Sequence, residues 1–155
     1  MTASIGSSVV EVCVFRFRGS GPEFLLLKRA SDEPVHPGIW QIITGTTHEG
    51  ETALVAARRE LEEETGLTPL HFWVVPYVTS FYDHRRDAVI MIPFFAAQCD
   101  GAAEPKLSHE HDLHEWLSFE EAERRLVWPG QRLGLEIVKR YIAAGEQAAG
   151  LMEVP

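Results

Sequence analysis

The segment from Gly45 to Leu67 constrains the fold of this chain more than any other part of the sequence. It reads GTTHEGETALVAARRELEEETGL, and residues 52–65 within it are rich in Ala, Leu, Glu and Arg and contain neither Gly nor Pro. Such residues have high helix propensity, and Gly66 stands where helices commonly end. The sequence therefore predicts one helix over 52–65, entered through a loop that contains glycine.

The segments on both sides of this helix have the composition of strands. Apolar, β-branched and aromatic residues predict strands over 9–17, 23–29, 39–44, 70–82, 87–98 and 111–117. A further helix is expected to start at Ser118, with Glu121 completing a capping box, and an amphipathic helix is expected over 131–146. Strands before, between and after helices favour an α/β domain with a mixed sheet between helices.

Three glutamates share one arc of the predicted helix. Glu60, Glu63 and Glu64 are spaced i, i+3, i+4, and like charges at these spacings oppose the helix by roughly 0.2–0.5 kcal/mol per pair. A bound hard cation such as Mg²⁺ would reverse this effect, because Mg²⁺ prefers oxygen ligands. The alternative is a solvated Glu/Arg surface. An adjoining apolar stripe, which would hold the helix against the sheet, is formed by Leu54, Ala57 and Leu61.

The whole segment 45–67 resembles the Nudix box, Gly-x5-Glu-x7-Arg-Glu-U-x-Glu-Glu-x-Gly-U, in which U is an aliphatic residue. The fixed positions are filled here by Gly45, Glu51, Arg59, Glu60, Leu61, Glu63, Glu64, Gly66 and Leu67. By this resemblance residues 1–155 would form a single Nudix hydrolase domain with the α/β/α sandwich of that family.

The resemblance implies metal-assisted attack of water on a diphosphate linkage, with Mg²⁺ or Mn²⁺ as the cofactor. It implies metal ligands at Glu60, Glu63, Glu64 and the backbone of Gly45, a general base at Glu60, and support for the glutamates from Arg59. Which glutamate acts as the base varies within the family and stays open here. Gly45 and Gly50 are expected to permit a tight loop before the helix, and Glu51 to brace that loop.

Residues outside the box supply further candidates. Glu110 is a candidate metal ligand or base, and Arg29 a candidate for binding substrate phosphates. Trp40 either stacks on a base or fills the core, and Tyr82 is a weak substrate-binding candidate. His109, His111 and His114 lie close together, but without a partnering cysteine set they favour contact with phosphate over zinc binding.

Charge limits the partners of this chain. The formal net charge is -9, which would repel a nucleic-acid polymer but allows a small phosphate ester that is bridged by divalent cations.

No apolar run reaches the roughly 20 residues of a membrane helix, and the first residues do not resemble a secretory signal, so we expect a cytoplasmic protein without membrane contact. Cys13 and Cys99 are expected to be buried free thiols rather than a disulfide. The sequence leaves open whether the chain forms a homodimer.

The segments IWQIITGTTHEGET and HEHDLHEWLSFEEA are most similar to the dATP pyrophosphohydrolase and dihydroneopterin triphosphate pyrophosphatase group. This resemblance implies that a nucleoside or pterin triphosphate is split to the monophosphate and pyrophosphate. A diadenosine polyphosphate hydrolase is the alternative, motivated by Tyr82. A nucleotide-binding module without turnover is disfavoured, because such modules usually lose box glutamates. The physiological substrate and the number of metal ions stay open.

Overall fold

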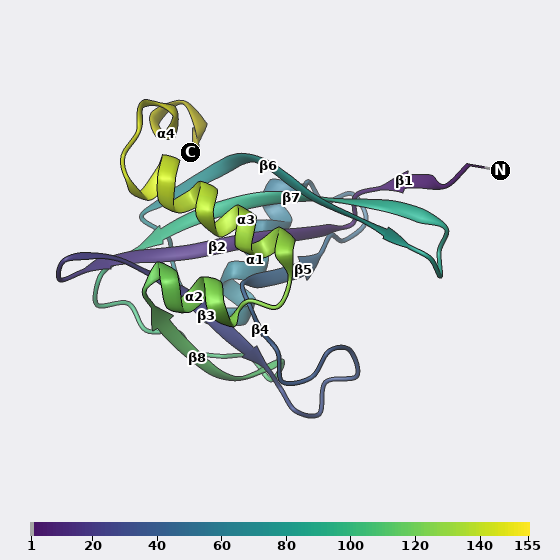
Figure 1. The fold of residues 1–155 in the computed structure, drawn as a ribbon, viewed down its shortest axis with the longest axis horizontal. Coiled ribbons are helices and arrows are strands. Elements are labelled where there is room, and N and C mark those ends of the chain that lie inside the picture. The colour runs from purple at the N-terminus through teal and green to yellow at the C-terminus, as the bar shows by residue number, and fades with distance from the viewer. Residues whose placement is uncertain (1) are drawn as a thin grey trace.

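The strand-rich segments of the sequence form one mixed sheet in the computed structural model, which describes residues 2–155 (Figure 1). The strands are β1 (Ser4–Gly6), β2 (Val9–Arg18), β3 (Gly21–Arg29), β4 (Trp40–Gln41), β5 (Ile43–Thr46), β6 (His71–Asp83), β7 (Ala88–Cys99), β8 (His111–Leu117) and β9 (Glu153–Val154). The main order is β4-β3-β2-β7-β6-β9, with β8 beside β3, β5 beside β2 and β1 beside β7. The pairs β2–β7 and β1–β7 are parallel and the others antiparallel, which confirms the mixed sheet.

Helices cover both faces of this sheet. They are α1 (Ala53–Thr65), α2 (Phe119–Arg125), α3 (Pro129–Ile137), the π-helix η1 (Val138–Ala143) and α4 (Gln147–Met152). Alternation along β2 separates the two cores, because successive strand residues point to opposite faces. Val12 and Val14 pack in the cluster that contains α1, whereas Cys13 and Phe15 pack in the cluster that contains α2, α3 and η1. The expected α/β/α sandwich is therefore the observed fold.

Two expected elements differ from the structure. The strand expected over 39–44 is split into β4 and β5, which pair with β3 and β2 respectively. The helix expected over 131–146 begins earlier, at Pro129, whose missing N–H costs nothing at a helix start. It continues as η1 and ends before Gly145, which has a φ of 70°. Cys13 and Cys99 are buried and free, as expected.

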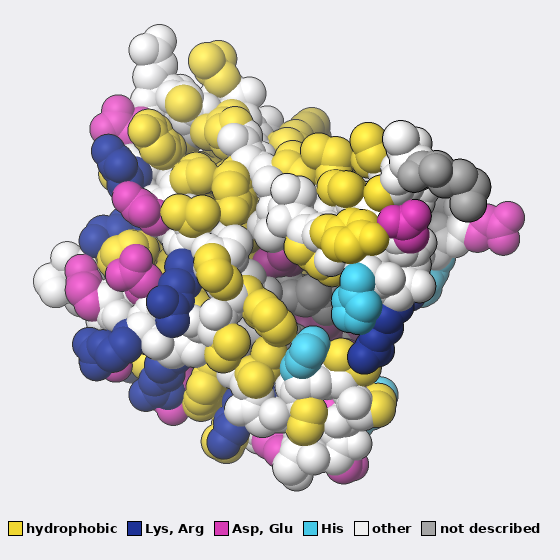
Figure 2. All heavy atoms as spheres, turned by 45° about the vertical axis from the view of Figure 1, so that its right-hand side comes forward, with side chains coloured by type: hydrophobic (Ala, Val, Ile, Leu, Met, Phe, Trp, Pro, Cys, Tyr) yellow, Lys and Arg dark blue, Asp and Glu magenta, His cyan; other side chains and the backbone are white. Residues whose placement is uncertain are grey.

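The far half of the β6–β7 hairpin, with β1 beside it, projects from the body of the molecule (Figure 1). Figure 2 shows that hydrophobic side chains gather on this face of the molecule, over the projecting hairpin and the C-terminal helices. Exposed hydrophobic side chains of β6 and of the C-terminal helices include Phe81, Tyr82, Leu133, Tyr141 and Leu151. Within residues 2–155 we find no helix with the length and hydropathy needed to cross a membrane.

Candidate functional site

Helix α1 holds the acidic residues beside the sheet. Its start is capped by Thr52, whose side chain accepts a hydrogen bond from the amide of Val55, and its end is capped by Gly66 with a φ of 65°. Ala57 and Leu61 are buried against the sheet, as the apolar stripe predicted. This rotation of the helix buries Glu60 and Glu64 and leaves Glu63 exposed.

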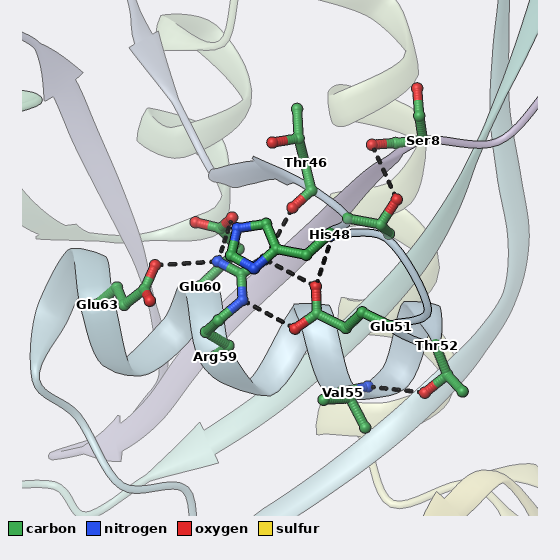
Figure 3. Close-up of polar contacts among 10 residues, drawn as sticks. Ser8, Thr46, His48, Glu51, Thr52, Val55, Arg59, Glu60 and Glu63 are labelled. Carbon is green, nitrogen blue, oxygen red and sulfur yellow. Dashed lines mark hydrogen bonds and ion pairs between the residues drawn. The ribbon is translucent and has the colours of Figure 1, made fainter.

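Arg59 links the glutamates of α1 to the loop that precedes the helix (Figure 3). Its guanidinium donates to both carboxylate oxygens of Glu51 at 2.8 and 3.0 Å, to Glu60 at 2.8 Å and to Glu63 at 2.9 Å. It also donates to the backbone carbonyl of Thr46 at 2.8 Å. These bonds raise the pKa of Arg59, and they fix the side chains that they join.

Glu51 braces the loop, as expected from its place in the box. Besides its two bonds to Arg59, it accepts a hydrogen bond from the backbone amide of His48 at 2.9 Å (Figure 3). The bonds from Arg59 and then from His48 lower the pKa of Glu51 to about 2. Glu51 is therefore a structural carboxylate that stays ionised.

Position 45 needs a glycine, but for a different reason from the flexible loop that the sequence suggested. Its φ is not positive, so the backbone does not require glycine; among the loop glycines Gly50 has that role, with a φ of 78°. Gly45 is needed for space, because a Cβ at this position would overlap the carboxyl group of Glu60. Burial raises the pKa of Glu60, although the bond from Arg59 opposes this shift.

Glu64 is an acidic residue buried in the interior without a hydrogen-bond partner. It is 2% exposed, and neither of its carboxylate oxygens has a hydrogen-bond partner. Burial, followed by the charges of Glu60 and Glu110, raises the pKa of Glu64 to about 9. The nearest cationic candidate, His111 Nε2, lies 3.9 Å from Glu64 Oε2, and burial lowers the pKa of His111 to about 4, so this imidazole is neutral at pH 7.

These residues fit a hard divalent cation. A buried carboxylate without a partner is costly, and a cation in contact with its oxygens would reverse that cost. In the region the structure covers, no three acidic, His or Cys side chains already surround one point. Arg59 bonds one carboxylate oxygen of each neighbouring glutamate, Glu60 Oε1 and Glu63 Oε2. The second oxygen of each carboxylate is not bonded to Arg59 and could contact a cation.

Two predicted residues outside the box lie near Glu64. Glu110 is close enough to raise the pKa of Glu64, and its backbone carbonyl accepts from the amide of Ala30 at 2.8 Å. Arg29 lowers the pKa of Glu64 by its charge. Its guanidinium donates to Glu33 at 2.9 Å and to the carbonyl of Val35 at 2.8 Å, so it is held by the loop that follows β3.

The other predicted residues are not gathered at Glu64. Trp40 packs against the core on the α3 side, with the guanidinium carbon of Arg125 5.1 Å from its ring centre. Tyr82 lies on the projecting hairpin, where its hydroxyl donates to Asp87 at 2.8 Å.

The three histidines are also separated. His109 is exposed, and His114 pairs with Glu104 at 3.2 Å. Only His111 is buried beside Glu64, and its Nε2 lies 3.4 Å from the side-chain amide nitrogen of Gln41.

Sequence reasoning missed a second group of buried polar side chains, on the α3 side of the sheet. Glu11 on β2 and Gln131 on α3 are each 3% exposed. A signal for Glu11 was present, since it is the one acidic residue inside the apolar run VVEVCVF. Burial raises the pKa of Glu11 to about 7, and a hydrogen bond from Gln131 opposes this shift. Nothing in the sequence around Gln131 indicated its burial.

Comparison with known proteins gives a consistent result. A family model described as the NUDIX domain matches residues 8–136. An octanoyltransferase of Myxococcus xanthus is 36% identical over 141 residues, which cover 86% of this chain but only 36% of that protein. The chain spans little more than a third of this relative's length, so the transferase name describes that protein and is not carried over to this chain.

Two further proteins are similar over a larger share of their own length. The nucleoside triphosphatase NudI of Escherichia coli is 30% identical over 105 residues, covering 63% of this chain and 74% of NudI. A structure from Listeria monocytogenes, described as a candidate NUDIX hydrolase, superposes with a TM-score of 0.73 at 22% identity. That superposition covers 85% of this chain and 91% of the other, and it supports the fold.

Proposed function

This chain belongs to the Nudix family, and we propose that it hydrolyses a nucleoside triphosphate or a pterin triphosphate to the monophosphate and pyrophosphate. The observation that carries this proposal is Glu64, a buried carboxylate on the box helix with two unpartnered oxygens. A phosphate-binding metal site gives these oxygens a purpose, whereas a purely structural role would leave their burial uncompensated.

Glu63 and Glu64 would hold the divalent ion together with Glu60, Glu110 and the backbone carbonyl of Gly45. When bound, Mg²⁺ or Mn²⁺ neutralises charge on the diphosphate oxygens and lowers the pKa of water. Glu60 would accept the proton of the attacking water on its carboxylate, because its partial burial makes it a stronger base than an exposed glutamate.

Arg59 would act through the glutamates rather than on the substrate. Its guanidinium donates to Glu60 and Glu63 and is itself fixed by Glu51, so it would orient both carboxylates for a cation. Arg29, beside Glu64, would bind a phosphate oxygen of the substrate.

A substrate panel tests the proposal. Purified protein is assayed with dATP, dGTP, dihydroneopterin triphosphate and diadenosine tetraphosphate, with Mg²⁺, with Mn²⁺ and with EDTA, and the products are identified. We expect pyrophosphate from a triphosphate, only when the metal is present. Dominant release of ATP from diadenosine tetraphosphate would reject this reaction in favour of the alternative hydrolase, in which Tyr82 on the projecting hairpin would contact the second nucleoside.

A nucleotide-binding module without turnover is tested by the same panel. Such a module would bind triphosphates but release no product under any metal condition. The Glu63→Gln and Glu64→Gln variants should each lose turnover with the fold intact, and equal activity of both variants and the wild type would reject the metal-site assignment.

A further inference from the structure

His111 is a buried polar residue that the proposed chemistry does not use. It is the first residue of β8, and its side chain is 0% exposed. On the neighbouring strand β3 it pairs with Arg29. Two residues earlier on β3, Leu27 pairs with Gln41 of β4. Leu27 packs in the cluster that contains α1, so Gln41 and His111 lie on the sheet face that α1 covers.

The other two glutamates of the candidate metal site are each held by a protein donor. Arg59 donates to Glu60 Oε1 and to Glu63 Oε2, and the second oxygen of each carboxylate is not bonded to it. Glu64 lacks such a donor, because both of its oxygens are buried without a partner. A carboxylate ligand is oriented by a hydrogen bond to the oxygen that the metal does not use. A donor that orients Glu64 therefore has to come from another residue.

His111 Nε2 is placed to be that donor. It lies 3.9 Å from Glu64 Oε2, so a shift of about 1 Å would bring the two atoms to hydrogen-bond distance. The side chains of His111 and Glu64 are 0% and 3% exposed. Since neither is open to solvent, a hydrogen bond between them would be stronger than the same bond at the surface.

The surroundings of the imidazole favour a proton on Nε2. Burial favours the neutral ring, which carries its one proton on either nitrogen. A proton on Nδ1 would be a buried donor without an acceptor, because Nδ1 has no partner. A proton on Nε2 would face Glu64 Oε2. The amide nitrogen of Gln41 lies 3.4 Å from Nε2, and a half-turn of that amide would offer its oxygen as a second acceptor. Buried donors are rarely left unpaired, so the Nε2–H form is the more stable one.

We propose that His111 is a positioning residue that donates from Nε2 to Glu64 and so holds this carboxylate for the divalent ion. The inference rests on the proposed function and adds a residue to its metal site. Oε2 of Glu64 would accept from the imidazole, and Oε1 would be left for the cation. The two carboxylates that Arg59 holds have the same division, with one oxygen bonded to the guanidinium and one not.

Two amide substitutions at position 111 test which ring nitrogen matters. Glutamine places its amide nitrogen close to the position of Nε2, whereas asparagine reaches only to that of Nδ1. The dissociation constant of Mn²⁺ is measured without substrate, by electron paramagnetic resonance of the free ion. We expect His111→Asn to weaken Mn²⁺ binding roughly 10–100-fold and His111→Gln to keep most of the affinity.

The control is the same exchange at an exposed histidine. His84 lies in the loop between β6 and β7, and His84→Asn should bind Mn²⁺ as the wild type does. Equal Mn²⁺ affinity of folded His111→Asn and the wild type would overturn the proposal. Equal weakening by His111→Asn and His111→Gln would overturn it as well, because a donor at the Nε2 position would then not preserve binding.

The tautomer is read in the wild-type chain, which keeps the test independent of the folding of any variant. The histidines are labelled with ¹⁵N, the His111 ring is assigned, and long-range ¹H–¹⁵N correlation spectra are recorded with Mg²⁺ bound. These spectra distinguish a proton on Nε2 from one on Nδ1. We expect the Nε2–H form of His111, and the Nδ1–H form would overturn the proposal.

Failure of this inference and failure of the proposed function give different results. Metal-dependent pyrophosphate release from a triphosphate, together with unchanged Mn²⁺ affinity in His111→Asn, would keep the proposed function and remove the positioning role. Mn²⁺ binding that is weakened in His111→Asn and preserved in His111→Gln, with no hydrolysis of any triphosphate, would support the positioning role and remove the proposed function.

Discussion

Gly45 and Glu60 lie so close together that the carboxyl group of Glu60 occupies the space where a side chain at position 45 would begin. The two residues belong to β5 and α1, and their contact sets how near the acidic helix approaches the edge of the sheet. A glycine that a sequence pattern marks as a loop residue is here a packing requirement, since its backbone conformation suits any residue.

We therefore expect Gly45→Ala to lower kcat strongly, by about tenfold or more, because the methyl group displaces the proposed base from its position. Steady-state kinetics on the preferred triphosphate measure this loss. Gly21→Ala is the matched control, since a Cβ at Gly21 meets no atom within 4 Å and its φ is not positive. Wild-type kcat in folded Gly45→Ala would show that the position of Glu60 does not matter.

Arg59→Lys should lower turnover by roughly 10–100-fold while the fold persists. A lysine ammonium cannot bond Glu51, Glu60, Glu63 and the carbonyl of Thr46 together, because its three donors diverge from one atom. Activity and Mn²⁺ affinity are measured in parallel. The same exchange at the exposed Arg124 should change neither, and an equal effect of both exchanges would argue against the role given to Arg59.

The Glu64→Gln variant should be more stable than the wild type without metal, but less active. In EDTA the variant should melt at a higher temperature than the wild type, because it removes a buried carboxyl group that has no partner and that must take up a proton when the chain folds at pH 7. It should also lose the rise in Tm that Mg²⁺ gives the wild type, and its turnover should fall by orders of magnitude. Glu62→Gln serves as the exposed control on the same helix. A full Mg²⁺-dependent rise in Tm for Glu64→Gln would place the ion elsewhere.

Glu11 should make stability fall as pH rises. Burial raises its pKa from the ordinary 4.5 to about 7, so between these pH values the folded state holds a proton that the unfolded state has released. Stability is therefore lost as pH increases through this window, by up to ~3 kcal/mol. Glu11→Gln removes this contribution and should raise Tm in EDTA at pH 8 but change it little at pH 5. If the Tm of the wild type and of Glu11→Gln changes with pH in the same way from pH 5 to pH 8, Glu11 is not the cause of the pH dependence.

Local signals in the sequence were sufficient for most elements of the fold. The Gly66 cap of α1, the Ser118 cap of α2 and the two strands β6 and β7 are confirmed, because each depends on residues that are neighbours in the chain. Thr52, predicted as the first residue of the helix, is its N-cap instead. The last helix, predicted over 131–146, was right in its helical course but not in its detail: it becomes a π-helix at Val138 and ends at Ala143. A run of helix-compatible residues does not indicate where a π-helix and a glycine will interrupt it.

The sequence by itself determined the family through the fixed positions of the box, and it determined the acidic helix, because spacing along one helix fixes which side chains share a face. It also supplied the metal ligands that we propose. Only the tertiary structure decided that Glu64 is buried without a partner, that Gly45 makes room for Glu60, and that Glu11 meets Gln131. These relationships join residues on different elements, and burial and electrostatics depend on distances in space that no local spacing encodes.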